Sequence, residues 1–161
     1  MKRIQAGSLL ATRLLLPANA APTHIVAVGA GAQIQAHLSL FLAAYPSIKS
    51  CVVVNRSENA RVLALRDHLL ALFPLVDTMS VPLSQDPEKH NTLKDAINNA
   101  SVIITATSST ESLFPSEWVR AGAHLCLIGS YKPEMSARST RTLLTAADEN
   151  VCTGTRLTHN W

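Results

Sequence analysis

The sequence has no run of lysine and arginine interleaved with aromatic residues, the pattern that is typical of nucleic-acid-binding proteins. Only 16% of its 161 residues are charged, and the formal net charge is +3. No apolar stretch reaches the roughly 20 residues that a membrane-spanning helix needs. We therefore expect neither a nucleic acid nor a membrane among its partners.

Signals for metal binding and for disulfide bonds are also weak. The six histidines are scattered, and no two of them have the spacing of paired zinc ligands. Each cysteine lies in or beside an apolar run that is typical of a buried strand: Cys51, Cys126 and Cys152. Reduced thiols in the core of a protein from a reducing compartment explain these positions best. We therefore expect no metal site and a cytoplasmic location.

The N-terminal segment admits two interpretations. Lys2 and Arg3 precede an apolar stretch, and Ala-Asn-Ala at 18–20 resembles a signal-peptide cleavage site. However, Arg13 interrupts the apolar part, and cleavage at that site would leave a strand almost at the new terminus. We favour an ordinary helix that ends at Pro17, with one face formed by Ile4, Ser8, Ala11, Leu14 and Leu15.

Strand-like and helix-like segments alternate along the chain with short connections. Apolar, β-branched runs predict strands at 24–28, 51–54, 78–81, 101–105 and 124–128, with a short one near Val151. Helical patterns lie at 4–16, 32–44, 58–72 (with Ser57 as its N-cap), 87–98, 115–120 and 139–147. The predicted fold class is α/β, a Rossmann-like, doubly wound, mainly parallel sheet with helices on both faces.

A Gly-x-Gly turn stands between the first predicted strand and the next helix. Gly29 lets the chain turn tightly, and Gly31 lets the backbone approach a pyrophosphate without a side chain in the way. Free N–H groups and the helix dipole favour negative charge there. Ile34 replaces the third small residue of the dinucleotide fingerprint. The strand–turn–helix order favours a nucleotide site over an ordinary turn, with the pyrophosphate held by Gly29, Gly31, Ala32 and Gln33.

The second predicted strand ends in Asn55, Arg56 and Ser57. In NAD-selective domains a carboxylate at this point accepts hydrogen bonds from the ribose hydroxyls. No such carboxylate stands here to repel a 2′-phosphate. Arg56 can pair with that phosphate and stack on the adenine, and Ser57 adds a donor. The alternative is a merely solvated Arg56. We favour NADP(H) over NAD(H), which stays an alternative, as the cofactor of any dinucleotide site.

Four loops of the predicted sheet should meet at one edge. In parallel α/β sheets, ligands bind outside the carboxyl ends of the strands. The loops at that edge are 29–33, 55–57, 105–110 and 129–132, and the third of them carries a cluster of hydroxyl side chains. Their convergence strengthens the prediction of a dinucleotide site beyond what the glycine turn supports alone.

Several ordered segments resemble the ornithine cyclodeaminase/mu-crystallin family. They are Arg3 with 6–13, 29–33 with His37, 53–57, 105–111 and 128–133. The resemblance implies the nucleotide-binding domain of a larger, commonly dimeric two-domain protein. Family members include NAD-dependent ornithine cyclodeaminases, NADP-linked ketimine reductases and amino-acid dehydrogenases, so the resemblance places the chain in amino-acid metabolism.

The resemblance also implies roles for residues at the ends of the site. Arg3 falls where the family places an arginine that grips the substrate carboxylate, which a bidentate guanidinium suits; a solvated terminal arginine is the alternative. Thr107 and Ser108 would line the ribose side. Ser130 and Tyr131 would lie near the nicotinamide. Tyr131 stands where cyclodeaminases have an aspartate, which favours a reductase or dehydrogenase.

By this resemblance the chain has three parts: a linking helix and connector at 1–22, a dinucleotide-binding domain at 23–136, and a divergent C-terminal helix and tail at 137–161. The family's catalytic lysine has no counterpart, so we assign no catalytic residue and expect a fragment, a truncated gene model or a degenerate copy. His37 is expected to face the sheet or a helix flank rather than a substrate.

Three functions stay open at this point. The chain could supply the nucleotide half of an NAD(P)-dependent oxidoreductase or cyclodeaminase that needs a substrate domain. It could be a non-catalytic NADP(H)-binding module that pairs with another chain or with a copy of itself. It could also be an inactive remnant that binds no ligand.

Overall fold

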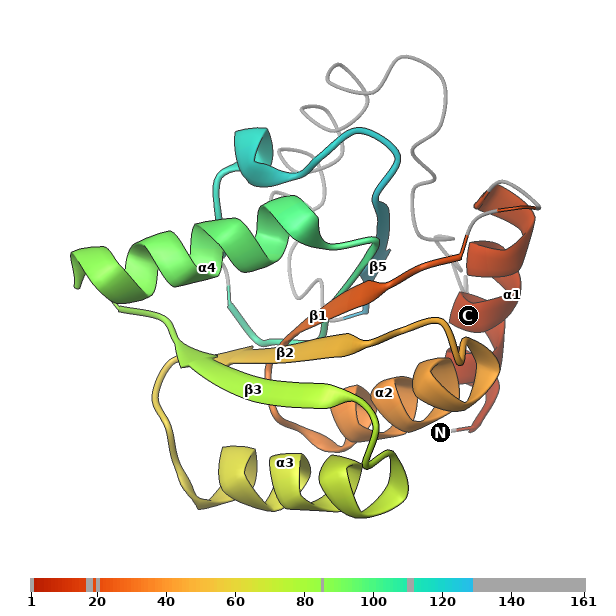
Figure 1. The fold of residues 1–161 in the computed structure, drawn as a ribbon, viewed down its shortest axis with the longest axis horizontal. Helices are drawn as coiled ribbons and strands as arrows, with labels where there is room; N and C mark the ends of the chain where they lie inside the picture. Colours follow the sequence, from red (N-terminus) through yellow and green to blue (C-terminus); the bar gives the residue numbers. More distant parts are fainter. Residues whose placement is uncertain (1, 17–18, 20, 85, 110–111, 129–161) are drawn as a thin grey trace, which may run out of the picture.

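The computed structural model describes residues 2–16, 19, 21–84, 86–109 and 112–128. Within them, a parallel sheet has the strand order β3-β2-β1-β4-β5 (Figure 1). Its strands are β1 (His24–Val28), β2 (Ser50–Asn55), β3 (Asp77–Pro82), β4 (Val102–Thr105) and β5 (His124–Leu127). The helices are α1 (Lys2–Leu15), α2 (Ala32–Ala44), α3 (Ala60–Leu72), α4 (Pro87–Asn99) and the 3-10 turn η1 (Ser116–Trp118). The predicted Rossmann-like α/β fold is confirmed.

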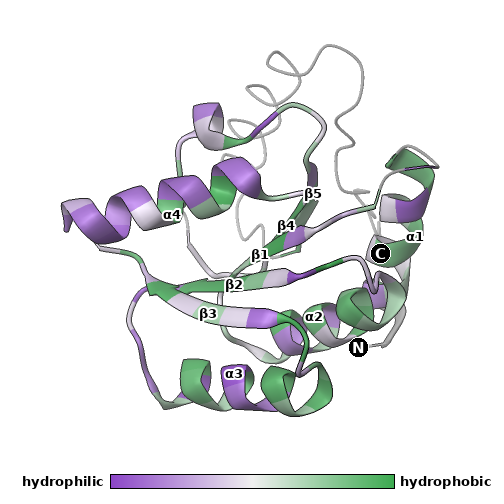
Figure 2. Cartoon of the chain, in the orientation of Figure 1, coloured by the Kyte–Doolittle hydropathy of each residue, from purple (hydrophilic) through white to green (hydrophobic). Residues whose placement is uncertain are grey.

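Helices cover both faces of this sheet. α2 and α3 pack on one face, with α1 beside α2, and α4 and η1 pack on the other (Figure 1). Successive strand residues point to opposite faces, so Ile25 and Ala27 join the α2–α3 core while Val26 and Val28 join the α4 core. This explains why β1 is apolar almost throughout. Figure 2 shows that α4, by contrast, is mostly hydrophilic along its length.

The strand register brings the carboxyl ends of the central strands together. Val28 at the end of β1 pairs with Val54 of β2 and with Thr105 of β4. Thr105 in turn pairs with Leu127 at the end of β5. From β1 the chain adds β2 and β3 on one side of the sheet, and then returns to add β4 and β5 on the other side of β1. Ligands bind at the point between β1 and β4 where the strand order reverses in this way. The loops that follow β1, β2 and β4 therefore start side by side.

The face of α1 that packs inward differs from the predicted one. Of the predicted face, Ile4 and Leu14 are 50% and 75% exposed, whereas Ser8, Ala11 and Leu15 are half-buried. Gln5 and Thr12 are buried instead, at 4% and 0% exposure. The prediction was wrong for Ile4 and Leu14 because the inner face combines Leu9, which packs against the core, with hydrogen-bonded polar side chains that contact α2 and β5.

The start of α3 also differs from the prediction. Its N-cap is Asn59 rather than Ser57, and the Asn59 side chain accepts hydrogen bonds from the backbone N–H groups of Arg61 and Val62 at 3.1 and 3.2 Å. An asparagine oxygen caps a helix as well as a serine oxygen does. The chain therefore keeps a longer turn after β2, and Arg56 stays ahead of the helix.

The cysteines and the elements predicted after β4 can also be compared with the structure. Cys51 and Cys126 are buried free thiols, as predicted, and burial raises their pKa to about 12 and about 11. The helix expected at 115–120 is only the short turn η1. The helix at 139–147, the strand near Val151 and Cys152 lie outside the described residues. No helix in the described part of the chain is long and apolar enough to cross a membrane.

Candidate functional site

Gly29, directly after β1, is required by the fold itself. Its φ of +114° is strained for any residue with a side chain. A Cβ at Gly29 would stand 2.8 Å from the carbonyl oxygen of Ala106 and 3.4 Å from Cγ1 of Ile34. The Gly29 N–H donates to the Val54 carbonyl at 2.7 Å. Contacts with β2, with the loop after β4 and with α2 therefore explain this glycine without any ligand.

Gly31, two residues later, has no such internal reason. It is the N-cap of α2 with φ −87° and ψ 175°, a conformation that any residue adopts. A Cβ at Gly31 would meet no atom of the described residues within 4 Å. Among the described residues, the space beside Gly31 is open. Because glycine has no side chain, a ligand can approach the backbone there directly.

The N-terminus of α2 is arranged for an anion. Within the part of the chain that the structure describes, no side chain caps it, and its first turn contains no acidic residue. In contrast, α3 and α4 are capped by Asn59 and Asp86. The first N–H groups of a helix have no partner within the helix, and the dipole adds partial positive charge. The open space at Gly31 is thus bordered by free donors.

Ala32 and Gln33 form the first turn of α2, and they differ in exposure. Ala32 is exposed, so its backbone is accessible from solvent. The Gln33 side chain is turned towards α1, where its Oε1 accepts a hydrogen bond from Nε2 of Gln5 at 3.2 Å. Gln33 can therefore contribute its N–H to an anion site, while its amide side chain is engaged elsewhere.

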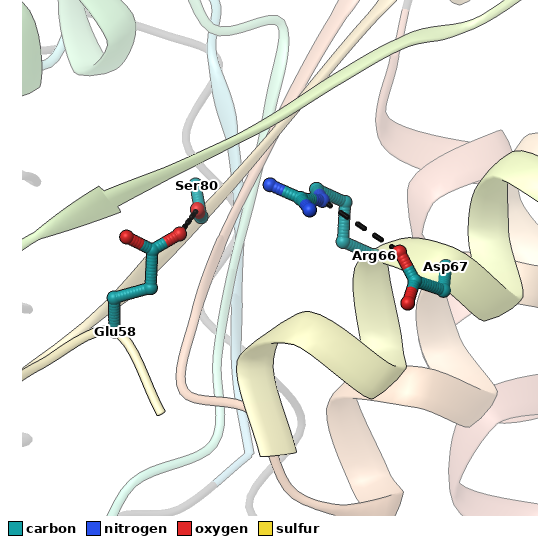
Figure 3. Close-up of polar contacts among 4 residues, drawn as sticks. All are labelled: Glu58, Arg66, Asp67 and Ser80. Carbon is teal, nitrogen blue, oxygen red and sulfur yellow. Dashed lines mark hydrogen bonds and ion pairs between the residues drawn. The ribbon is translucent and has the colours of Figure 1, made fainter. Parts of the chain in front are cut away.

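Arg56 and Ser57 lie exposed in the turn between β2 and α3. The turn is held by the Asn55 side chain, whose Nδ2 donates to the Ser57 carbonyl at 3.0 Å. Arg56 makes no ion pair with any described residue. The one described ion pair joins Arg66 and Asp67 on α3 at 3.9 Å (Figure 3). The Arg56 guanidinium is therefore available to an anionic ligand.

A carboxylate that the sequence prediction overlooked also lies in this turn. Glu58 accepts a hydrogen bond from the Ser80 hydroxyl of β3 at 3.0 Å, and Figure 3 shows the two side chains pointing towards each other. Glu58 is visible three positions after Asn55, but only the pairing of β2 with β3 places it beside Ser80. This bond directs the carboxylate towards β3.

The loop after β4 supplies hydroxyl groups. Thr107 is half-buried, and its Oγ1 accepts a hydrogen bond from the Ser109 N–H at 3.3 Å. Ser108 is exposed. The Ala106 N–H donates to the Val28 carbonyl at 3.1 Å, which fixes this loop against the glycine turn. Two of the predicted loops thus touch each other directly, and Gly29 joins them to the end of β2.

Three of the predicted site residues cannot be placed in the same way. Ser130 and Tyr131 lie outside the described residues, as does the whole loop at 129–132. Arg3 belongs to α1, and its side chain lies outside what the structure describes. Among the described residues there is no group of three histidine, cysteine or acidic side chains that could hold a metal ion. The described part of the site is suited to binding an anionic ligand.

Behind this edge, α1 and α2 meet through polar side chains whose pairing the sequence did not predict. His37 is fully buried, with Nδ1 2.7 Å from the Gln33 carbonyl and Nε2 3.2 Å from the Ser8 hydroxyl. Burial lowers the pKa of His37, against the opposing effect of the bond to Gln33. His37 faces a helix flank, as expected. The spacing of Gln5, Ser8 and Thr12 along α1 was the available signal for this contact.

Comparisons with known proteins agree with this architecture. The model of the ornithine cyclodeaminase/mu-crystallin family matches residues 1–148. Ketimine reductase mu-crystallin of Mus musculus is 31% identical over 134 residues, which make up 83% of this chain and 37% of the mouse protein.

Two solved structures share the fold. The probable ornithine cyclodeaminase from Bordetella pertussis Tohama I has a TM-score of 0.65 at 24% identity, over 83% of this chain and 37% of that one. The Thermococcus litoralis Δ1-pyrroline-2-carboxylate reductase, solved in complex with NADH and L-proline, has a TM-score of 0.62 at 18% identity, over 83% and 39%. This chain spans well under half the length of these relatives.

Proposed function

Because this chain belongs to the ornithine cyclodeaminase/mu-crystallin family, we propose that it binds a nicotinamide dinucleotide, NADP(H) in preference to NAD(H), across the carboxyl edge of its sheet. The observation that carries this proposal is the open space at Gly31 beside the uncapped N-terminus of α2. Nothing within the described protein requires a glycine there, whereas a pyrophosphate does. Free N–H groups at the same point supply the donors that its oxygens accept.

The preference for NADP(H) rests on the turn after β2. Arg56 is exposed and free of ion pairs among the described residues, and Ser57 beside it is exposed as well. A guanidinium binds a phosphate through two parallel hydrogen bonds and stacks on an adenine ring. The nearby Glu58 carboxylate is directed to Ser80. The adenosine end of the cofactor then lies at residues 55–57, with the ribose side at Thr107 and Ser108.

The wider role is that of the nucleotide half of an enzyme that moves a hydride between a nicotinamide and an imine carbon. The cofactor supplies this chemistry, and the protein binds and orients it. Residues 23–136 form the dinucleotide domain, with 1–22 as the linking segment and 137–161 as a divergent end. Arg3 binds a substrate carboxylate, and Ser130 and Tyr131 lie near the nicotinamide. The catalytic partner is a substrate domain, present in another chain or in a further part of this protein.

The test is a fluorescence titration of NADPH and of NADH with the purified 161-residue chain. We expect NADPH emission to change on binding, and Arg56→Glu to weaken NADPH by about 10- to 100-fold, the cost of losing a hydrogen bond to a charged group. NADH binding should change much less, because NADH has no 2′-phosphate. The matched control is Arg61→Glu, the same change at an exposed residue of α3, which should leave both affinities unaltered.

Each outcome separates the candidate functions. Equal losses for NADPH and NADH in Arg56→Glu would contradict the assignment of Arg56 to the 2′-phosphate. Binding of NADPH without turnover of cyclic imines excludes the inactive remnant, and it is expected both of a non-catalytic module and of an enzyme half tested without its substrate domain. A wild-type chain that binds neither nucleotide would refute the dinucleotide site and favour an inactive remnant.

A further inference from the structure

A group of polar side chains, which we term the α1–α2 polar contact, lies behind the glycine turn. Its members are Gln5 and Ser8 of α1 and Gln33 and His37 of α2. Gln33 is bonded twice: its side chain accepts from Gln5, and its carbonyl oxygen lies 2.7 Å from His37 Nδ1. Gln33 is also in the first turn of α2, beside the proposed pyrophosphate site. The contact therefore joins α1 to the residues that would bind the cofactor.

The protonation of His37 follows from its partners. A carbonyl oxygen only accepts hydrogen bonds, so Nδ1 carries a proton and donates it to Gln33. Burial disfavours the charged ring, so Nε2 is unprotonated and is an acceptor that lies 3.2 Å from the Ser8 hydroxyl. That hydroxyl has one proton, which it donates either to Nε2 or to the Ile4 carbonyl at 3.1 Å. The His37 ring thus has a distinct partner on each side, one on each helix.

We propose that His37 is a positioning residue for cofactor binding: with Ser8 it holds the first turn of α2 against α1, and so orients the N–H groups that bind the pyrophosphate. The Gln33 carbonyl and the Ile34 N–H belong to the same planar peptide group. A bond that fixes this carbonyl therefore also fixes one of the free N–H groups at the start of α2. This inference rests on the dinucleotide site proposed above and adds α1 to it as a supporting element.

Thr12 provides an internal comparison on the same helix. Its hydroxyl donates to the Ser8 carbonyl at 2.7 Å and lies 3.7 Å from Sγ of Cys126 in β5. Thr12 is therefore as much a part of the α1 interface as Ser8, but its side chain contacts the sheet rather than α2. A change at Thr12 perturbs the packing of α1 without touching His37 or Gln33.

The experiment measures two affinities for each variant by titration calorimetry. One ligand is NADPH, and the other is adenosine 2′-monophosphate, which carries the 2′-phosphate but no pyrophosphate. The variants are Ser8→Ala, His37→Leu, His37→Asn and the control Thr12→Val. Circular dichroism and urea unfolding identify the conditions in which each variant is fully folded, so that a lower affinity does not reflect a smaller folded fraction.

We expect Ser8→Ala to weaken NADPH by about 3- to 10-fold, the effect of one neutral hydrogen bond, and His37→Leu by about 10-fold or more. His37→Asn places an amide donor where Nδ1 stood, so it should restore NADPH affinity to the level of Ser8→Ala. Thr12→Val should leave it unchanged. Adenosine 2′-monophosphate should bind all variants equally, because it does not reach the start of α2.

Several results would overturn the proposal. NADPH affinity equal to wild type in both Ser8→Ala and His37→Leu would do so, as would a parallel loss of both ligands or an equal loss in Thr12→Val. Should His37→Leu not fold, Ser8→Ala decides, since it trims only a half-buried hydroxyl. If the wild type binds neither ligand, the dinucleotide site itself is refuted. If the wild type and all variants bind NADPH with equal affinity, only the role of His37 is refuted.

Discussion

Alanine substitutions at the two glycines of the turn should have opposite consequences. Gly29→Ala is expected to destabilise the fold, whereas Gly31→Ala is expected to leave the fold nearly intact and to weaken the cofactor. The two positions are separated by a single residue and receive the same added methyl group. Any difference between them therefore reflects their surroundings.

The magnitudes follow from the local geometry. At Gly29, φ of +114° costs a side-chain-bearing residue about 1–3 kcal/mol. The new Cβ would also stand 2.8 Å from the Ala106 carbonyl oxygen, a backbone atom that cannot rotate away, and such overpacking adds about 1–3 kcal/mol. At Gly31 there is neither strain nor overlap, and alanine is a poorer N-cap than glycine by less than about 1 kcal/mol.

Two measurements test this contrast. Urea unfolding followed by circular dichroism should show a loss of about 2–6 kcal/mol for Gly29→Ala and under about 1 kcal/mol for Gly31→Ala. NADPH titration of Gly31→Ala should show a dissociation constant raised by about tenfold or more, because the methyl group occupies the path of the pyrophosphate. Unchanged NADPH affinity in Gly31→Ala would refute the assignment of the open space to the cofactor, and a fully stable Gly29→Ala would contradict the described turn.

Three further predictions concern stability alone. Asn59→Ala removes the cap of α3 and should lower the free energy of unfolding by about 1 kcal/mol in urea; no loss would mean that the cap is dispensable. Ile34→Ala should cost about 2–5 kcal/mol, since the Ile34 side chain of α2 is fully buried in the core beside Gly29; a loss under about 1 kcal/mol would indicate that this site is loosely packed. Burial lowers the pKa of His37 and of His124, so the unfolded chain takes up protons that the folded chain does not. The free energy of unfolding should therefore fall as the pH decreases below about 6.5, the ordinary pKa of histidine, and recover above it. In His37→Gln the free energy of unfolding should depend less on pH. An unchanged pH dependence in this variant would mean that other groups cause the effect.

Much of the fold was predictable because local rules and burial agree along most of the chain. β1 at His24–Val28 and α2 at Ala32–Ala44 have the predicted bounds. The apolar pattern of β1 is followed directly by Gly29, and that of α2 is followed directly by Tyr45-Pro46. The strand order β3-β2-β1-β4-β5 was not predicted, because right-handed crossovers fix the hand of each connection but not where the sheet reverses.

The two misplaced features, the inner face of α1 and the start of α3, both depend on polar contacts. The inner face of α1 is built on Gln5 and Thr12, whose hydrogen bonds compensate for their burial. Hydrophobic periodicity does not detect such a face. The start of α3 moved by two residues because Ser57 and Asn59 are both good caps, and only the turn held by Asn55 selects between them.

The two glycines of the turn have different explanations. Gly29 is fixed by the approach of the β4 loop, so it would be retained by a chain that had lost its cofactor. Gly31 has only its weak preference as an N-cap within the described residues, so a ligand is the stronger reason for it. The side chains at the start of α2 are also explained by the fold, since Ile34 is buried in the core and Gln33 is bonded to α1. Evidence for cofactor binding therefore comes from Gly31, from the uncapped helix end and from Arg56, and a test of function should be aimed at these positions.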